Sequence, residues 1–323
     1  MRFVKYRYEG ADRLGLRVDE TRVVDTGFSD LRQYLRASEP EQAAVAALVE
    51  TATAVVPERL LAPLADRCQI IYAGGNYANH LAEVAHLITP VEPVFFPGLW
   101  SSVIGPGDAI VIPEQRTATD YEAELTFVIS KTAKNVAAAD AWQYVFGYTM
   151  INDVSARDVM QRESLQIMLC KSPDTFCPVG PDIVTADEVG EIGGRRITTT
   201  VNGVLKQDAT TDMMVVRIPE LIEFLTRTVT LSPGDVVTTG TPGGVGAFRT
   251  PPEFMKPGDV VTVAVEGVGE LTNPLVAGWA SGADAVDAVS TGTGVAPGAT
   301  PAAEAAGDVG PAAGAASELA GAA

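Results

Sequence analysis

Cysteine and histidine, the residues that build disulfide frameworks and zinc sites, are scarce in this sequence. Of 323 residues, three are cysteine and two are histidine. The cysteines (Cys68, Cys170 and Cys177) are odd in number, form no Cys-x-x-Cys pair and have no histidine nearby in the chain. Neither a disulfide framework nor a Cys/His zinc site is therefore expected.

Long apolar runs and an excess of positive charge are also missing. No run reaches the roughly 18 apolar residues that span a bilayer, and the opening residues MRFVKYRYEG hold no apolar core of signal-peptide length. Lys and Arg number 23 against 41 Asp and Glu, which gives a net charge of −18. This charge argues against nucleic acid and against an anionic membrane surface as partners. We expect a cytoplasmic protein whose partner is a small molecule.

Changes in residue pattern divide the chain into three parts. Residues 1–65 combine short alternating runs with helical spacing, which predicts a small β-rich N-terminal domain. In residues 66–277, three Pro-Gly-Asp turns each precede a β-branched run, which is typical of a tight turn entering a strand. This part is predicted to be α+β and mainly β, because strands and helices do not alternate as in a parallel sheet. Residues 278–323 are almost wholly small or Pro residues without Lys or Arg, which predicts a disordered, dispensable tail.

Three carboxylates in strand-like runs carry the strongest chemical signal. Glu122 and Glu124 belong to DYEAELTFVI, and Asp153 ends YVFGYTMIND. Residues two apart on a strand point to the same face, so Glu122 and Glu124 are expected to project together. Three converging acidic groups repel one another unless a cation neutralises them, and an all-oxygen set favours Mg²⁺, with Mn²⁺ or Ca²⁺ as alternatives. Taken alone, such a Glu-x-Glu pair is more often a solvated face of an antiparallel sheet.

Both histidines lie in the segment GGNYANHLAEVAH. His80 and Glu83 are three residues apart, so on a helix they share a face and can hydrogen-bond. A carboxylate so placed fixes the imidazole tautomer and lets His80 act as a general base on water. Alternatively, the pair only decorates a helix. A zinc site of His80, Glu83 and His86 is not expected, because helix positions six apart lie about 120° from each other around the axis.

Two further segments have anion-binding character. Lys171 lies in CKSPDTFCPVGP, which lacks the Gly-rich lead of a phosphate loop, so a solvated Lys in a Pro-bounded loop is the plain alternative. GTPGGVG at 240–246 is Gly-rich after a strand, and its backbone N–H groups could hold a carboxylate. Because it does not fit Gly-x-Gly-x-x-Gly, a nucleotide site is not expected.

The ordered set of motifs over roughly residues 66–277 resembles the fumarylacetoacetate hydrolase family. In order, the motifs are NYANH-LAE, PVFF, SSVIGPGD, DYEAELTFVI, GYTMINDVSARD, KSPDTFCPVGP, VNGVLKQ, LSPGDVVTTGTPGGVG and KPGDVVTVAVEGVGELTN. The opening RFVKYRY…RLGL also resembles the bacterial N-terminal domain of that family. The resemblance implies a mixed, mainly β fold built on a rolled sheet, usually as a homodimer.

The resemblance also implies roles for particular residues. The family's Mg²⁺ or Mn²⁺ ligands, a Glu-x-Glu and a later Asp, fall on Glu122, Glu124 and Asp153. Its catalytic His–Glu dyad and loop Lys fall on His80, Glu83 and Lys171. Substrate-contacting positions fall on Arg157 and Thr241, and we add Gln161 to them.

The sequence departs from the family pattern at two places. Gly98 stands where relatives commonly carry a Lys near the metal, which removes a cation from the expected pocket. Met160 stands where many members carry Gln, and a Gln follows one residue later at Gln161. The ligands and the dyad are intact, so an active enzyme is still expected.

The expected reaction is Mg²⁺-dependent hydrolysis of a carbon–carbon bond next to a carbonyl, in a 1,3-diketone or an acylpyruvate, as in aromatic catabolism. His80 would activate water, Lys171 would stabilise charge or supply a proton, and Arg157 and Thr241 would hold a substrate carboxylate. The alternatives are a decarboxylase or an isomerase/tautomerase of oxaloacetate- or 2-hydroxymuconate-type substrates through an enolate. From a different class, the protein could be a metal-binding module without turnover.

Overall fold

The computed structural model describes residues 1–84, 92–114, 116–160 and 166–278. Three sequence expectations lie outside these residues: the substrate contact Gln161, the second histidine His86, and the tail from residue 279 onward.

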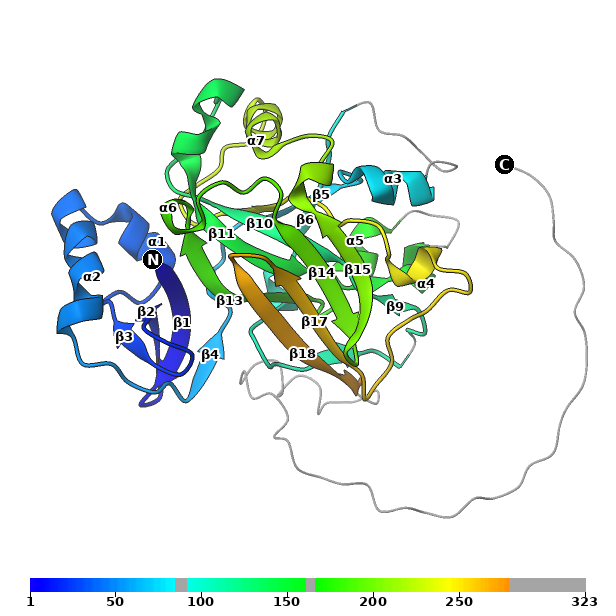
Figure 1. The fold of residues 1–323 in the computed structure, drawn as a ribbon, viewed down its shortest axis with the longest axis horizontal. Coiled ribbons are helices and arrows are strands. Elements are labelled where there is room, and N and C mark those ends of the chain that lie inside the picture. Colours follow the sequence, from blue (N-terminus) through cyan, green and yellow to red (C-terminus); the bar gives the residue numbers. More distant parts are fainter. Residues whose placement is uncertain (85–91, 115, 161–165, 279–323) are drawn as a thin grey trace, which may run out of the picture.

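The described chain folds into short helices and many strands (Figure 1). The strands are β1 (Arg2–Tyr8), β2 (Ala11–Arg17), β3 (Val23–Asp25), β4 (Arg59–Leu61), β5 (Ile70–Gly74), β6 (Val94–Gly98), β7 (Val103–Ile104), β8 (Ile110–Ile112), β9 (Thr119–Asp120), β10 (Ala123–Ile129), β11 (Val145–Asn152), β12 (Ser155–Ala156), β13 (Cys177–Thr185), β14 (Arg196–Val201), β15 (Val204–Thr210), β16 (Val236–Thr238), β17 (Val260–Val265) and β18 (Gly269–Ala277). The α-helices are α1 (Leu31–Arg36), α2 (Glu39–Thr51), α3 (Ala78–Val84), α4 (Arg157–Met160), α5 (Ile167–Lys171), α6 (Ala186–Val189) and α7 (Ile218–Thr226). Four 3₁₀ helices are η1 (Trp100–Ser102), η2 (Ala138–Tyr144), η3 (Thr211–Met213) and η4 (Gly246–Phe248).

A large mixed sheet forms the centre of the molecule. Its strands follow the order β3-β2-β1-β13-β11-β10-β16-β5-β6, and β10 pairs antiparallel with both of its neighbours. Every residue of β10 is buried, because both faces of the strand are covered. Leu125 and Phe127 join one hydrophobic cluster, and Val128, on the other face, joins a second. Glu124 shares the face of Val128, which places a carboxylate in an otherwise apolar interior.

A smaller sheet covers one face of this central region (Figure 1). Its order is β15-β14-β17-β18-β8, and β14 and β17 alternate buried and accessible residues as one-sided strands do. The inward side chains Val263 and Leu271 lie in the same hydrophobic cluster as Leu125 and Phe127. The predicted α+β, mainly β fold is confirmed.

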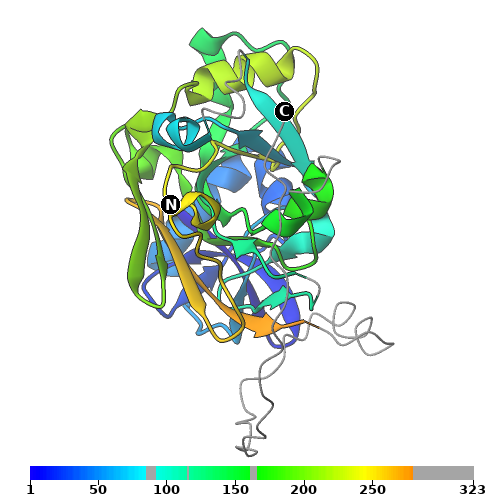
Figure 2. The same ribbon diagram turned by 90° about the vertical axis from the view of Figure 1, so that its right-hand side faces the viewer.

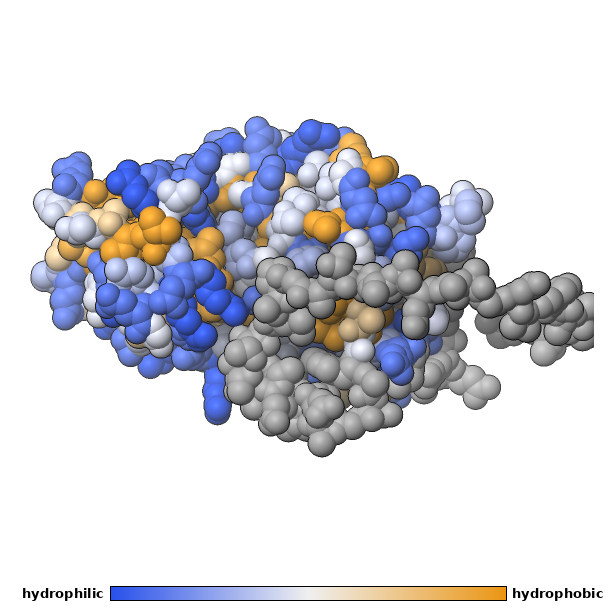
Figure 3. Space-filling model, turned by 90° about the horizontal axis from the view of Figure 1, so that it is seen from below, coloured by the Kyte–Doolittle hydropathy of each residue, from blue (hydrophilic) through white to orange (hydrophobic). Residues whose placement is uncertain are grey.

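Residues 1–65 form β1 to β4, α1 and α2, seen at the left of Figure 1. Strand β1 pairs with β13, in the register Arg2↔Val184 and Phe3↔Ile183, so these residues extend the large sheet. Seen from below, this part is mostly hydrophilic with one group of hydrophobic residues (Figure 3). Its treatment as a separate domain stays a prediction.

The opposite end of the molecule brings together helices and loops from distant parts of the sequence. Figure 2 looks onto this end, where α3 in cyan, the yellow segment around η4 and the green helices α4 and α5 face the viewer. The residues that the sequence singled out for chemistry gather here.

Candidate metal centre and active site

Strand register brings the three predicted carboxylates together. Ala123 at the start of β10 pairs with Asn152 at the end of β11, so Glu122 and Asp153 face each other just beyond the pair. The Asp153 N–H donates to the Glu122 carbonyl at 2.9 Å. Ligand oxygens of Glu122, Glu124 and Asp153 all lie within 4.8 Å of one another, and all three residues are buried. The alternative of a solvated Glu-x-Glu face is wrong.

Two of these carboxylates have oxygens that fit a cation. Glu124 Oε2 and Asp153 Oδ1 are buried and have no hydrogen-bond partner among the described residues. A buried polar atom without a partner is costly, so such atoms point to a ligand. Glu122, Glu124 and Asp153 would hold a hard divalent ion, because oxygen is the ligand that such ions prefer.

Two basic side chains partly neutralise the cluster. Lys171 ends α5 and is 4% exposed, and its Nζ donates to Glu122 Oε2 and to Asp153 Oδ2, each at 2.6 Å. Arg157 donates through Nη2 to Glu122 and through Nε to Asp120 Oδ2, the latter at 2.9 Å. The solvated-loop alternative for Lys171 is therefore wrong.

The charges in this region leave room for one divalent ion. Four buried carboxyl groups, those of the three ligands and Asp120, face the two basic side chains Arg157 and Lys171. If all are ionised, two negative charges remain in excess, and one divalent cation would balance them. The predicted role of Arg157 in holding substrate stays a prediction, because its guanidinium donates here to two carboxylates of the protein, those of Asp120 and Glu122.

Burial and the neighbouring charges shift the pKa values of the three predicted ligands in different directions. Burial raises the pKa of Asp153 to about 7, although the Lys171 ammonium acts against it. Burial, followed by the negative charges of Asp153 and Glu122, raises the pKa of Glu124 well above its usual value. For Glu122, burial is outweighed by Lys171 and Arg157, and its pKa falls to about 2. In the metal-free protein, Glu122 is thus the ionised member while the other two retain protons at acidic pH.

These shifts predict that cation affinity rises with pH. A metal must displace the protons of Asp153 and Glu124, so affinity should climb between about pH 5 and pH 8, on the order of tenfold per unit for each proton displaced. The stability of the metal-free protein should change the opposite way. An acid whose pKa is raised by folding binds more protons when folded, so stability falls as pH rises from about 4 to about 7. Calorimetric Mg²⁺ titrations at several pH values, with thermal midpoints in chelator, measure both. An affinity independent of pH would contradict the assignment of the ligands.

The predicted dyad is formed on α3. His80 Nδ1 lies 3.0 Å from Glu83 Oε2, and the other carboxylate oxygen of Glu83 accepts from the Gly244 N–H at 2.7 Å. Glu83 is thereby held from two sides, which fixes the imidazole that it contacts. His80 lies near enough to Glu122 to be among the groups that lower the pKa of that carboxyl, after Lys171 and Arg157.

The Gly-rich loop after β16 binds carboxylates, but those of the protein itself. Besides the contact to Glu83, the N–H groups of Gly246 and Ala247 donate to the two oxygens of Asp120, at 2.7 and 3.0 Å. The loop therefore connects the dyad on α3 to Asp120 on β9, two residues before Glu122. Thr241, a predicted substrate contact, lies in this loop and is 3% exposed.

Two buried residues of the site were not singled out from the sequence. Asp120 links Arg157 to the Gly-rich loop, and Gln207 on β15 hydrogen-bonds to Ala123 and to Thr241. Both stand in motifs that the sequence does show, DYEAELTFVI and VNGVLKQ. Their long-range partners gave no sequence signal.

Gly98 has a structural reason for lacking a side chain. A Cβ at this position would lie 2.6 Å from the buried Tyr72 ring, which stacks on Phe96 at 5.2 Å between ring centroids. Tyr72 in turn donates its hydroxyl to Cys177 Sγ at 3.0 Å. The space that a Lys would enter is thus filled by a fixed aromatic ring.

Gly98→Lys is therefore expected to destabilise the protein without improving catalysis. Overpacking a filled core costs about 1–3 kcal/mol, and the Tyr72 ring is fully buried. Chemical denaturation should show a lower midpoint than the parent protein. Val94→Lys is the matched control, because it introduces the same side chain at an exposed position of the same strand, β6. Equal or better stability and turnover for Gly98→Lys would show that the ring moves freely.

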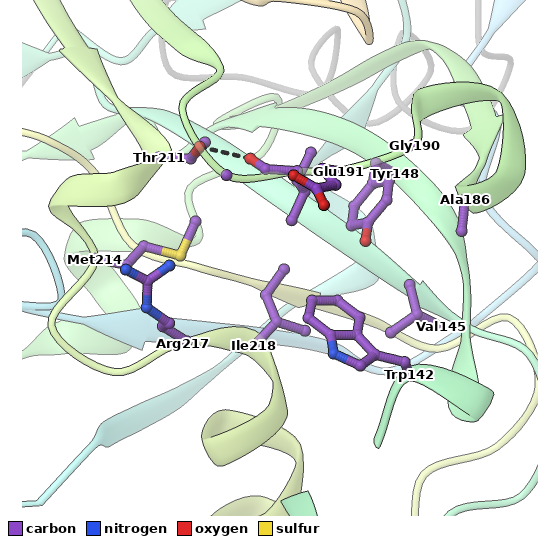
Figure 4. Close-up of a pocket in the computed structure, with 12 residues that line it drawn as sticks. Trp142, Val145, Tyr148, Ala186, Gly190, Glu191, Thr211, Met214, Arg217 and Ile218 are labelled. Carbon is purple, nitrogen blue, oxygen red and sulfur yellow. Dashed lines mark hydrogen bonds between the residues drawn. The ribbon is translucent and has the colours of Figure 1, made fainter. Parts of the chain in front are cut away.

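A cavity of about 460 Å³ lies elsewhere in the molecule (Figure 4). Its lining includes Trp142, Val145, Tyr148, Met214, Arg217 and Ile218. Because a strand rises about 3.3 Å per residue, Tyr148 lies about 16 Å along the chain from Asp153. Of the predicted site residues that the structure describes, none lines this cavity.

The chain is similar to a known family and to individual proteins of that family. The family model for the C-terminal region of fumarylacetoacetate hydrolase matches residues 69–276. The mitochondrial oxaloacetate tautomerase fahd2 of Xenopus laevis is 46% identical over 218 residues, which are 67% of this chain and 68% of that protein. The mitochondrial oxaloacetate tautomerase FAHD2A of Homo sapiens is 42% identical over 217 residues, 67% and 69% of the two chains.

Solved structures show the same fold. The fumarylacetoacetate hydrolase from Exiguobacterium antarcticum superposes with a TM-score of 0.74 at 32% identity, covering 86% of this chain and 99% of that one. A 5-carboxymethyl-2-hydroxymuconate delta-isomerase from Mycobacterium smegmatis gives 0.69 at 32% identity, covering 87% and 100%. Within the described residues, none of the helices is long and apolar enough to cross a membrane. The relatives are named as mitochondrial proteins, so a cytoplasmic location for this chain stays a prediction, as does the homodimer.

Proposed function

The chain belongs to the fumarylacetoacetate hydrolase family, and from its site and the relatives it matches we propose that it is a Mg²⁺-dependent tautomerase of oxaloacetate-type 2-oxo acids. The observation that supports this most is the buried set Glu122, Glu124 and Asp153, whose unpartnered oxygens fit a divalent ion beside His80. The relatives at 42–46% identity described above are named oxaloacetate tautomerases. They favour the tautomerase alternative over the carbon–carbon hydrolase that the sequence led us to expect first.

Keto–enol interconversion requires little of the protein beyond two proton transfers. One proton leaves C3 of oxaloacetate and one arrives at the C2 oxygen, and no bond between heavy atoms breaks. A divalent ion, when bound, supplies the positive charge that favours an enolate over the ketone. The chain must therefore provide a base near carbon, a charge near oxygen, and contacts that orient the diacid.

The described residues can meet these needs. His80, held by Glu83, is the base that takes or returns the C3 proton. Lys171 remains an ammonium, since Asp153 and Glu122 raise its pKa despite its burial, so it stabilises negative charge and does not act as a base. Thr241 and Arg157 are proposed to face the substrate carboxylates.

Carbon–carbon hydrolysis remains a second candidate, because the dyad that removes a proton from carbon could equally remove one from water. Hydrolases such as the maleylpyruvate hydrolase from Sphingobium share the fold, at a TM-score of 0.72 and 29% identity.

The proposal is tested by following the enol of oxaloacetate in the near ultraviolet after the solid enol is dissolved. With Mg²⁺, the protein should accelerate its conversion to the keto form well above the buffer blank. Excess chelator should return the rate to that of the blank. An unchanged rate with the metal-loaded protein would contradict the proposed function.

A further inference from the structure

A single buried amide connects the metal-ligand strand to the Gly-rich loop. Gln207 on β15 is fully buried, and its side chain makes four hydrogen bonds. Its Oε1 accepts from the Ala123 N–H at 2.9 Å and from the Thr199 hydroxyl at 2.6 Å. Its Nε2 donates to Thr241 Oγ1 and to the Pro242 carbonyl, each at 2.8 Å. These four bonds use its whole hydrogen-bonding capacity.

The orientation of this amide is fixed by its neighbours. A backbone N–H can only donate and a backbone carbonyl can only accept, so the Gln207 oxygen must face Ala123 and its nitrogen must face Pro242. Thr241 Oγ1, on the nitrogen side, is therefore an acceptor toward Gln207. The hydroxyl proton of Thr241 is left for another partner, and none of the described residues receives it.

We propose that Gln207 is a positioning residue that fixes the Thr241 hydroxyl as a hydrogen-bond donor to the substrate, and thereby selects diacids over monoacids. A hydroxyl that accepts from an amide directs its own proton away from that amide and becomes a better donor. A donor of this kind suits a carboxylate oxygen. The inference rests on the proposed function for its substrate class, a 2-oxo acid with a second carboxylate.

The same amide sets where Thr241 stands relative to the metal ligands. Ala123, which Gln207 contacts through its oxygen, lies between Glu122 and Glu124 in the chain. Thr241 and the ligand strand are thus held by opposite ends of one rigid planar group. In the proposed binding mode, the 2-oxo end of the substrate lies at the ligand region and its distal carboxylate lies at Thr241.

The test uses malate and lactate, which differ by one distal carboxylate and are not tautomerised. Their affinities for the Mg²⁺-loaded protein are measured by calorimetry, and the malate-to-lactate ratio is the readout. Gln207→Met and Thr241→Val should each lower this ratio by on the order of tenfold, the effect of losing a hydrogen bond to a charged group. The double variant should lose no more than either single one, because both changes remove the same contact.

Two further variants serve as matched controls. Thr241→Ser keeps the hydroxyl and should keep the ratio. Thr199→Val removes only a partner on the oxygen side of Gln207, so it should leave the ratio unchanged. If Gln207→Met does not fold, Gln207→Glu replaces it: the carboxylate cannot donate, so the Thr241 hydroxyl turns toward it and the ratio falls.

Two results would overturn the inference. One is an equal loss of affinity for malate and lactate in Gln207→Met, which would mean that the residue only supports the ligand strand. The other is a double variant whose loss is the product of the two single losses. Both readouts are independent of turnover. A protein that shows the expected ratios but no tautomerisation would refute the proposed function alone, and one that tautomerises without a Gln207-dependent ratio would refute this inference alone.

Discussion

Glu124→Gln is expected to abolish turnover and to leave the metal-free protein folded and at least as stable as the parent. Gln replaces an anionic ligand by a neutral one, so Mg²⁺ affinity should fall by on the order of 100-fold, and activity with it. Stability should not fall, because Glu124 Oε2 has no partner among the described residues, and burial, followed by the Asp153 and Glu122 charges, already raises the pKa of this carboxyl. Calorimetric Mg²⁺ titration, enol decay and thermal unfolding in chelator give the three quantities.

Glu270→Gln is the matched control, since it makes the same chemical change at an exposed position on β18. It should leave all three quantities unchanged. A Glu124→Gln protein that binds Mg²⁺ and turns over like the parent would show that the carboxylate cluster is not the metal centre.

His80→Ala should reduce tautomerisation by on the order of 10² to 10⁴ while leaving KM nearly unchanged. Other groups hold the substrate, so the variant slows the proton transfer and the loss of rate appears in kcat. Oxaloacetate decarboxylation, if the protein has it, depends mainly on the metal and should suffer less. Steady-state rates of both reactions on the same preparation measure the difference.

Glu83→Gln should lose less activity than His80→Ala, because it weakens the orientation of the imidazole without removing it. The carboxylate serves both the imidazole and the Gly244 N–H, whereas Gln offers one acceptor oxygen for those two contacts. An intermediate loss, about tenfold, is expected from weaker orientation of His80. Full activity of the His80→Ala protein would show that the imidazole takes no part in the proton transfer.

Local periodicity was sufficient to group the two glutamates of the proposed metal site. The alternation of a strand put Glu122 and Glu124 on one side, but a solvated face remained the plain alternative, and their burial is a finding of the structure. What the sequence could not supply was the register of β10 against β11. That register, with Ala123 opposite Asn152, decides that Asp153 lies beside Glu122 and not several residues away.

Contacts between distant segments account for what the sequence did not show. Lys171 resembles any loop lysine in sequence, and only the packing of α5 carries its ammonium into the carboxylate cluster. The loop amides of Gly244 and Gly246 were expected to bind an anion, but their partners Glu83 and Asp120 come from more than 100 residues away in the chain. The sequence showed only that Gly98 replaces a Lys of the family pattern. The structure adds the reason, since the Tyr72 ring occupies the space that a side chain at position 98 would need.

The most direct test of the account compares two reactions in one Mg²⁺-loaded sample. The rate of enol-to-keto conversion of oxaloacetate is measured against the rate of carbon–carbon cleavage of an acylpyruvate, with products identified by NMR. The account predicts that kcat/KM for tautomerisation exceeds that for cleavage by on the order of 100-fold or more, and that chelator and Glu124→Gln abolish it. Efficient cleavage of the acylpyruvate with no tautomerisation above the buffer blank would contradict it.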